Sequence, residues 1–338
     1  MSIKYAPIWR LILFAALAAT WPMCISVEKT KAAGETRSHF SGTFLQLDAG
    51  NAIWSEAQWD EEFASMKRLG MNILIVQWAA TPEQVYYPAK DLPGRRYVPS
   101  PLDIVMQKAE KYGFLVYLGP YMNEAWWSCY MDASFVEQEL AITARVAGEL
   151  YSLYGRSPAF AGWYLPYEIN ASAVSAPAAR HYAARLLRQA VDLLHGITPN
   201  KPVTISPFFD RQLSIDMFES WWKEALTGSG ITTVFLQDGV GTQRGISPEI
   251  AAQYFAAMRR ATAAAGIRLW GDLEIFVEST WTSAPWERVK SQMVAEAPHV
   301  EGFVIFEYNH YMSPVRGGAA KELYDIYFRY LQDMAVSQ

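Results

Sequence analysis

Short apolar runs alternate with longer amphipathic stretches from residue 42 onward. Eight runs rich in β-branched and aromatic residues predict strands. They begin near Thr43, Asn72, Phe114, Phe160, Pro202, Thr232, Arg268 and Phe303. Each run is followed by a stretch with apolar residues three and four positions apart, which is the spacing of one helix face. Eight alternating strand and helix units predict an α/β fold, a single (β/α)8 TIM barrel over residues 42–334.

Capping residues mark where several of these helices begin and end. Ser55 is a candidate N-cap with Gln58 three residues later, and Gly70 is a candidate C-cap of the same helix. Pro101 and Gly113 bracket the second helix in the same way. The agreement between caps and hydrophobic spacing supports the strand and helix units.

A doubly wound sheet is the alternative fold for alternating strands and helices. Such a sheet binds nucleotides through a glycine-rich turn, and none of the strand-to-helix turns shows GxGxxG or GxxxxGK[ST]. Successive strands also fill the chain evenly and leave no block for a second domain. The pattern therefore favours the barrel.

The first residues have the pattern of a secretory signal. Lys4 and Arg10 precede an apolar run over residues 11–19, which is short for a membrane span. We expect a signal peptide over residues 1–26 and a polar linker over residues 27–41. Cleavage after Ala18, Ser26 or Ala32 would each place small residues at the cut.

Removal of this segment predicts a periplasmic or secreted protein with no stable membrane span. If the cut follows Ser26, only one of the 2 cysteines remains, namely Cys129, so no disulfide framework can form.

Composition and charge narrow the class of protein. The chain has 338 residues, 51% of them hydrophobic, which excludes a disordered segment. Its net charge is −5, and it has no block of like charges, so nucleic acid is not an expected partner. Core packing accounts for most of the 13 Trp and 19 Tyr, but so many flat, half-polar rings are also typical of a sugar-binding cleft.

The chemistry of such a barrel lies where its strands end, so the last residues of each strand are informative. Carboxylates, amides and aromatic rings gather at these positions. They include Gln77 and Trp78 on strand two; Tyr121, Asn123, Trp126 and Trp127 on or after strand three; and Glu168 and Asn170 on strand four. Strand six contributes Asp238, strand seven Trp270 and Glu274, and strand eight Glu307, Tyr308 and His310.

This mixture excludes several reaction types. Only His310 among the 5 His lies at a strand end, so we expect no metal site and no cofactor. A serine nucleophile would need a GxSxG turn, and none is visible. Phosphate binding would need basic or glycine-rich turns after strands seven and eight, where the chain has Glu274 and Glu307 instead.

Glycoside cleavage fits these residues better, because it needs one carboxylic acid and one carboxylate across the scissile bond. Glu168 follows an aromatic strand that could raise the pKa of its carboxyl, as a general acid requires. Trp270, Asp272 and Glu274 share one face of strand seven, and Glu274 lies nearest its end. We therefore assign Glu168 as acid/base and Glu274 as nucleophile.

Two glutamates at the ends of strands four and seven resemble the large clan of retaining TIM-barrel glycosidases. The segments GTFLQL, WDEEFASMKRLGMNILIVQW, GWYLPYEIN, ISPFF, QDGVG and FEYNHYMSP are similar to a bacterial barrel family known only as a domain of unknown function. That family is presumed to contain glycoside hydrolases. The resemblance covers nearly the whole chain after the signal segment.

One position departs from the clan, in which an asparagine that binds the sugar 2-hydroxyl precedes the acid/base glutamate. This chain has Tyr167 there, so Gln77 or Asn123 would take that task. The departure leaves Glu307 and Asp238 as alternative nucleophiles, and an inverting pair would then be more than ~5 Å apart.

Each candidate also has a structural interpretation. Trp78, Trp126, Trp127 and Trp270 could stack on sugars or pack between helix and barrel. Asp238 could shape the QDGVG turn. Glu307, Tyr308 and His310 could bind substrate or brace the two catalytic glutamates.

Two functions follow. The first is a monomeric, endo-acting glycoside hydrolase for a β-linked polysaccharide or oligosaccharide, such as a bacterial exopolysaccharide or β-glucan. The second is a non-catalytic carbohydrate-binding barrel that assists exopolysaccharide export.

Overall fold

A computed structural model describes residues 39–169 and 176–336. The predicted signal peptide, most of the predicted linker and Asn170 lie outside these residues.

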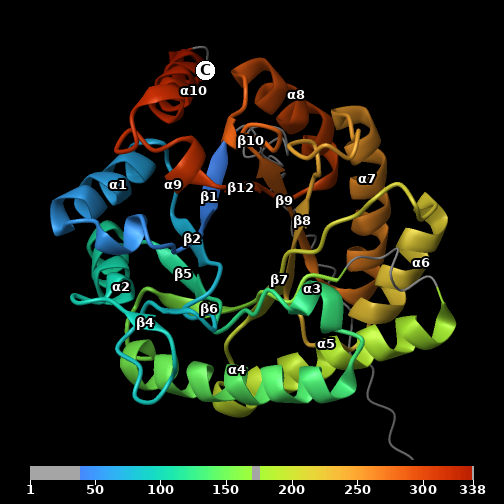
Figure 1. Cartoon of the computed structure of the whole chain (residues 1–338). Helices are drawn as coiled ribbons and strands as arrows, with labels where there is room; N and C mark the ends of the chain where they lie inside the picture. Colours follow the sequence, from blue (N-terminus) through green and yellow to red (C-terminus); the bar gives the residue numbers. More distant parts are fainter. Residues whose placement is uncertain (1–38, 170–175, 337–338) are drawn as a thin grey trace, which may run out of the picture. The chain divides into compact units, whose positions relative to one another are not determined.

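Eight parallel strands close into a barrel in the order β1-β12-β9-β8-β7-β6-β5-β2, and β1 pairs with β2 to complete the ring. Figure 1 looks along this barrel, with the helices arranged outside the strands. The (β/α)8 TIM barrel is therefore confirmed. Its strands are β1 (Phe40–Leu45), β2 (Ile73–Val76), β5 (Leu115–Leu118), β6 (Phe160–Leu165), β7 (Val203–Ile205), β8 (Thr233–Gln237), β9 (Arg268–Glu274) and β12 (Phe303–Phe306).

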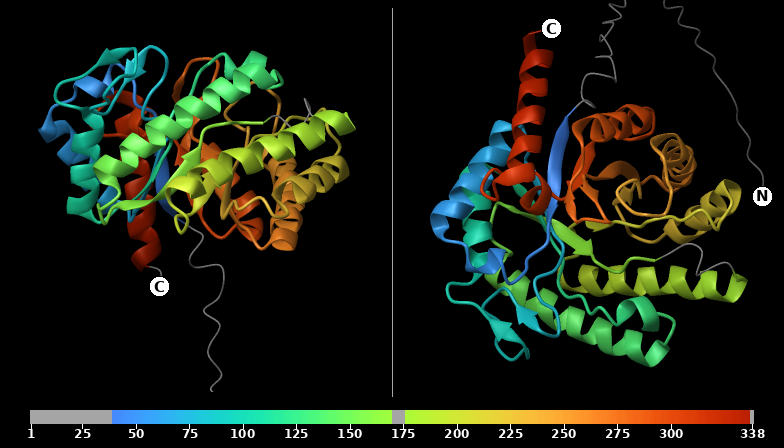
Figure 2. Two further views of the ribbon diagram at one scale, coloured as in Figure 1. Left: turned by 90° about the horizontal axis from the view of Figure 1, so that it is seen from below. Right: turned by 45° about the horizontal axis from the view of Figure 1, so that its top comes forward.

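A long helix follows each barrel strand. These helices are α1 (Glu56–Arg68), α2 (Pro101–Tyr112), α4 (Ala133–Tyr154), α5 (Pro177–Ile197), α6 (Ile215–Leu226), α7 (Pro248–Ala265), α8 (Trp286–Glu296) and α10 (Gly318–Val336). Most caps expected from the sequence are present, but the C-cap of α1 is Leu69, and Gly70 follows it with φ 80°. Ser55 and Gln58 form a capping box on α1, and Gly113 ends α2 in the left-handed conformation with φ 70°. Figure 2 shows α4 and α5 side by side outside the barrel.

Short elements that the sequence pattern did not predict lie in the connections between the barrel strands and the long helices. They are η2 (Asn51–Ile53), β3 (Gln84–Val85), β4 (Arg95–Arg96), α3 (Trp126–Cys129), β10 (Phe276–Val277), β11 (Thr282–Ser283), η4 (Ala297–His299) and α9 (Tyr308–Tyr311). Strand β3 pairs with β4, and β10 pairs with β11. Most of these elements build up the end of the barrel where the strands end.

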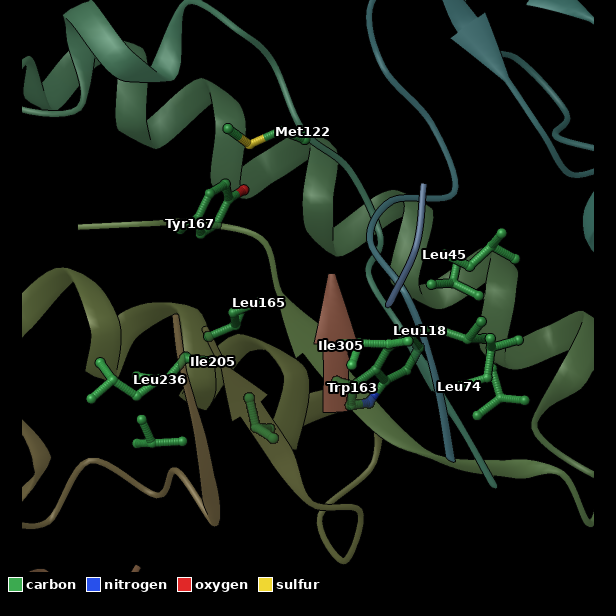
Figure 3. Close-up of a cluster of buried hydrophobic side chains, with 14 of the residues drawn as sticks. Leu45, Leu74, Leu118, Met122, Trp163, Leu165, Tyr167, Ile205, Leu236 and Ile305 are labelled. Carbon is green, nitrogen blue, oxygen red and sulfur yellow. The ribbon is translucent and has the colours of Figure 1, made fainter. Parts of the chain in front are cut away.

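Alternating side chains of the strands form two apolar cores. Inside the barrel, Phe44, Tyr164 and Phe235 form one buried cluster, with the Phe44 and Tyr164 ring centroids 5.2 Å apart. Outward-facing residues such as Leu74 and Leu236 pack against the helices, as the labelled side chains in Figure 3 show. Because the inner cluster fills the barrel, polar groups are left to the strand ends.

The first strand begins at Phe40, two residues before the boundary expected at residue 42. The Phe40 N–H donates to the Tyr327 hydroxyl at 2.7 Å, and the two rings stack with centroids 4.5 Å apart. Phe40 is also paired with Phe303 in the sheet, so it belongs to the barrel rather than to a linker. Within the described residues, no helix has both the length and the apolar character needed to cross a membrane.

Candidate active site

A cleft of about 610 Å³ lies at the strand ends beside Glu168. The loops after β1, β2, β5 and β6 supply its walls. The described residues that line it are Gln46, Leu47, Asp48, Ala49, Gln77, Trp78, Thr81, Glu83, Gln84, Tyr86, Met122, Glu124, Trp127, Pro166 and Glu168. We refer to this feature as the cleft.

Glu168 follows β6, lines the cleft and is half-buried. Burial raises the pKa of Glu168 to about 7, while a hydrogen bond with Gln237 and the charge of Arg244 act in the opposite direction. A carboxyl group with this pKa can hold and release a proton near neutral pH, as a general acid must.

The backbone around Glu168 is held by two stacked aromatic rings. Trp126 is fully buried, and its indole N–H donates to the Glu168 carbonyl oxygen at 2.8 Å. The Trp126 and Tyr167 rings stack at 4.4 Å, and the Tyr167 hydroxyl contacts Thr143 at 2.5 Å. Trp126 therefore positions Glu168 and offers no free face to a sugar, which corrects its expected place on the rim.

Glu274 ends β9 on the face of the strand that it shares with Asp272. Its Oε2 accepts a hydrogen bond from the Gly241 N–H at 2.8 Å. A Cβ added to Gly241 would lie 2.8 Å from the Glu274 Cβ, so only glycine allows this approach. Burial raises the pKa of Glu274 well above its usual range. The negative charges of Asp238 and Asp272 add to this, whereas the Gly241 N–H and Arg244 favour the ionised form.

Three further carboxyl groups lie behind Glu274, and we call Asp238, Asp272 and Glu296 the buried carboxyl cluster. Burial raises the pKa of Asp238 to about 6, and it raises those of Asp272 and Glu296 well above their usual range. Asp238 accepts hydrogen bonds from Gln292 and from the Val240 N–H. Asp272 and Glu296 have carboxyl oxygens without a hydrogen-bond partner, so these two groups of the cluster hold protons at neutral pH.

Two arginines accompany these acids without forming an ion pair with them. Arg288 donates to the carbonyl oxygens of Glu274 and Phe276, at 2.8 and 2.6 Å, and so ties the end of β9 to α8. Arg244, in the loop after β8, lies over the Phe208 ring at 4.6 Å, and its charge reaches both Glu168 and Glu274. Arg244 is thus the positive group that the two predicted catalytic residues share.

Glu307 and His310 belong to a different arrangement at the ends of β12 and β1. His310 lies between two carboxylates: Nδ1 contacts Glu307 Oε1, and Nε2 lies 2.7 Å from Asp48 Oδ2. The other Glu307 oxygen accepts the Gln46 N–H at 2.8 Å. Burial opposes ionisation of Asp48, yet hydrogen bonds from His310 and from the Asn51 N–H lower its pKa to about 2. We call Asp48, His310 and Glu307, which are linked in that order by hydrogen bonds, the paired chain.

Tyr308 and Trp270 do not lie on the rim where the sequence placed them. Tyr308 is fully buried, and its hydroxyl lies 2.6 Å from the Ser65 hydroxyl of α1. Trp270 packs inside the barrel, level with Phe235 and two residues before Asp272 on the same strand. Both side chains pack within the protein, because Tyr308 begins α9 and packs toward α1, and Trp270 lies too deep along β9 to reach the cleft.

Gln77, Trp78 and Trp127 line the cleft, as the sequence predicted. Trp127 is 48% exposed, and the Trp78 indole N–H donates to the Leu47 carbonyl oxygen at 3.3 Å.

Two other predicted binding residues point elsewhere. Tyr121 is buried, and the Asn123 side chain is occupied by Glu139 and by the Ala125 N–H, at 2.9 and 3.0 Å. Asn123 therefore does not replace the missing asparagine of the clan.

Several residues near the site were not predicted from the sequence. Arg244, Gln292 and Glu296 come from a loop and a helix with no motif, so only the closed fold brings them to Glu274. Trp281 is 61% exposed and stacks on Phe276 at 5.4 Å, beyond the end of β9. In the part of the chain that the structure describes, no group of three or more His, Cys, Asp or Glu could hold a metal ion.

Comparison with known proteins identifies a family and the fold. Residues 40–317 match the family model described as Domain of unknown function (DUF4434). No curated protein sequence matches the chain.

Solved structures share the barrel. A protein from Bacteroides thetaiotaomicron described as a "putative alpha-L-fucosidase" is 23% identical, with a TM-score of 0.73 over 87% of this chain and 95% of its own. The endo-1,4-beta-D-mannanase of Thermotoga petrophila is 14% identical, with a TM-score of 0.55 over 86% of this chain and 99% of its own. The endo-1,4-beta-mannanase of Rhizomucor miehei is 12% identical, with a TM-score of 0.54 over 80% of this chain and 86% of its own.

Proposed function

The chain belongs to the DUF4434 family, and we propose that it is a glycoside hydrolase that cleaves a β-linked polysaccharide with retention. Its catalytic residues in this proposal are Glu168 as acid/base and Glu274 as nucleophile. The similar structures include two enzymes whose names state that they act on mannan, which supports a carbohydrate substrate for this barrel as well.

The observation that carries the proposal is that both glutamates are free of ion pairs. Among the described residues, no Lys or Arg side chain lies within ion-pair distance of the Glu168 or Glu274 carboxyl group. A purely structural glutamate at a strand end would be expected to have such a partner. Two buried, unpaired carboxyl groups that share Arg244 favour catalysis over a non-catalytic binding barrel.

In the first step Glu168 protonates the glycosidic oxygen while Glu274 attacks the anomeric carbon. The leaving sugar departs with the proton of Glu168, and a glycosyl ester forms on Glu274. Glu168 then removes a proton from water, which attacks the same carbon and releases Glu274. The pKa of about 7 suits a residue that acts first as an acid and then as a base.

Glu274 must be ionised to attack. The Gly241 N–H and Arg244 stabilise its negative charge, and the carboxyl groups of Asp238 and Asp272 oppose it. The buried carboxyl cluster resolves this conflict if it carries the protons, because neutral carboxyl groups repel Glu274 far less. The cluster is then a proton store that keeps Glu274 ionised.

The cleft supplies groups for sugar binding. Gln77 has a side-chain oxygen without a partner and replaces the asparagine that the clan carries before its acid/base residue. Trp78 and Trp127 offer indole rings along the cleft. A cleft with long loops on both sides suits attack within a chain, so we propose endo action on an exopolysaccharide or β-glucan by a monomeric, periplasmic or secreted enzyme.

Two isosteric substitutions test the proposal. Glu168→Gln and Glu274→Gln are each expected to lose at least ~100-fold in kcat/KM on whichever substrate of a β-glucan, mannan and exopolysaccharide panel the wild type cleaves. Glu62→Gln is the matched control, since Glu62 is also buried, with a pKa raised to about 7, but accepts hydrogen bonds from Asn309 and Ser313 on another side of the barrel. Unchanged activity in both variants would overturn the assignment.

The pH profile gives a second measurement on the same enzyme. Glu168 must be protonated for the first step, so kcat/KM of the wild type is expected to fall above about pH 7. The residual activity of Glu168→Gln should lack this basic limb. A basic limb retained by the variant would assign the proton donor to another residue.

A further inference from the structure

The cleft is acidic on every wall. Asp48 comes from the loop after β1, Glu83 from the loop after β2, Glu124 from the loop after β5 and Glu168 from the end of β6. The described residues that line the cleft include no Lys, Arg or His, although the whole chain has 29 Lys and Arg against 34 Asp and Glu. The negative charge of the cleft is therefore concentrated there, because the chain as a whole has nearly equal numbers of acidic and basic residues.

Two of these four groups, Glu83 and Glu124, keep a negative charge without an ion-pair partner among the described residues, because Asp48 pairs with His310 and Glu168 holds a proton near neutral pH. Asp48 is ionised and shares His310 with Glu307. Glu83 accepts only a hydroxyl hydrogen bond from Thr81 at 3.2 Å, and neither Glu83 nor Glu124 has an ion-pair partner among the described residues. Exposed carboxylates that converge across a cleft attract a cation or a donor-rich ligand.

Gln77 gives an independent indication of the ligand. Its side chain is only 8% exposed, lines the cleft, and has an oxygen with no hydrogen-bond partner. A buried carbonyl oxygen without a donor destabilises the protein unless a ligand or water supplies one. Gln77 therefore adds another acceptor to a cleft that already has many.

Aromatic rings complete the lining. Trp78, Tyr86 and Trp127 lie among the carboxylates, and Tyr86 stacks on Tyr97 with ring centroids 5.7 Å apart. Carboxylates together with indole and phenol rings are the usual surroundings of a bound ammonium group. An acidic sugar would meet four acidic residues in the cleft and no positive side chain among the described lining residues.

We propose that the cleft binds polysaccharide segments that carry free amino groups, with Glu83 and Glu124 as the residues that select the ammonium and Gln77 as an acceptor on the floor. This inference rests on the proposed glycoside hydrolase function and names the substrate class: amino sugars without N-acetyl groups, preferred over neutral sugars, with uronic acids disfavoured.

Binding to matched oligosaccharides tests the proposal. Glucosamine oligomers are compared by calorimetry with their N-acetylated forms and with glucose oligomers of the same linkage, for β-1,4 and β-1,6 linkages, in the full chain carrying Glu274→Gln. We expect the glucosamine oligomer of one linkage to bind at least ~5-fold more tightly than its two counterparts, with an affinity that falls as salt is raised.

Neutralising the two selecting residues tests the mechanism. The double variant Glu83→Gln/Glu124→Gln is expected to lose about 5-fold in affinity for the glucosamine oligomer and none for its N-acetylated form. The control is Glu110→Gln/Glu322→Gln, which removes the same charge from exposed positions on α2 and α10, outside the cleft. The reversal Glu83→Lys/Glu124→Lys should shift the preference toward oligogalacturonate.

The outcomes separate this inference from the proposed function. Glucosamine oligomers that bind no better than both counterparts, or a double variant that behaves like the control, would overturn the inference. Tight binding without hydrolysis of any oligomer by the wild type would support the cleft and remove the hydrolase function. Hydrolysis of neutral chains with no preference for amines would keep the function and overturn the inference.

Discussion

Two sides of the barrel hold buried acids in opposite ways. On the β1 and β12 side, Glu307 has both oxygens occupied, one by His310 and one by the Gln46 N–H. On the β8 and β9 side, Asp272 has one oxygen bonded to the Ser206 hydroxyl at 2.9 Å, while its other oxygen has no partner. On the β1 and β12 side, the buried carboxylate has a hydrogen-bond partner for each oxygen. On the β8 and β9 side, several buried carboxyl groups share too few hydrogen-bond donors.

This difference separates structure from chemistry. A buried carboxylate with a full set of partners stabilises the fold and resists a change of protonation. A group of buried acids with few donors costs stability, and such costs concentrate where catalysis needs perturbed pKa values. Glu307 therefore braces the strand ends, and Glu274, beside the buried carboxyl cluster, is the better nucleophile.

The largest effect expected from this comparison is on activity. Glu274→Gln should lose at least ~100-fold in kcat/KM, whereas Glu307→Gln should lose less than ~10-fold, because Glu307 has no oxygen free to attack. Kinetics of the two variants on one substrate measure the contrast. An equal or larger loss in Glu307→Gln would move the nucleophile to β12.

Stability should respond in the reverse order. His310→Ala leaves Glu307 fully buried without its partner, so the free energy of unfolding should fall by about 3 kcal/mol in chemical denaturation. The control is His181→Ala on α5, whose ring contacts Glu224 at the surface and should matter by less than ~0.5 kcal/mol. A similar, small loss in both variants would mean that the paired chain does not brace the barrel.

Replacing one carboxyl group of the buried carboxyl cluster by a neutral amide should stabilise the protein. Glu296 has its pKa raised by burial and by neighbouring acids, so the folded state holds a proton that the unfolded chain releases above its ordinary value of 4.5. The free energy of unfolding of the wild type therefore decreases as the pH rises above that value, because folding must keep Glu296 protonated. Glu296→Gln should be more stable by about 1 kcal/mol at pH 8 and unchanged at pH 4. Equal effects at both pH values would contradict shared protons in the cluster.

The smallest expected effect concerns Arg244. Its charge lowers the pKa of both Glu168 and Glu274, so Arg244→Ala should raise both and move the two limbs of the pH profile upward by a few tenths of a unit. Arg329→Ala removes the same charge from an exposed position on α10 and should leave the profile in place. A shift of only one limb would show that Arg244 does not serve both residues.

The fold was predictable from local patterns. Each barrel strand coincides with a β-branched or aromatic run, and Ser55, Pro101 and Gly113 occupy the caps expected of them, because these signals act over a few residues. The short pairs β3–β4 and β10–β11 were missed, since two-residue strands carry no periodicity.

The site was predictable only in part, because side-chain direction depends on packing between distant segments. Trp126 and Trp127 are adjacent and chemically identical, yet one is fully buried and the other is 48% exposed. Their separation depends on the stack with Tyr167, which the sequence does not reveal. Trp270 was misplaced because period-two alternation identifies a face of β9 but not the depth along it.

Trapping the covalent intermediate would identify the nucleophile itself. A 5-fluoro glycosyl fluoride of the sugar that the wild type hydrolyses keeps the group at C2 and should slow release of the enzyme-bound sugar, and peptide mass spectrometry then locates the label. We expect one label, on Glu274, and none in Glu274→Gln. A label on Asp238 or Glu307, or turnover with inversion and no label, would contradict the assignment of Glu274 as nucleophile.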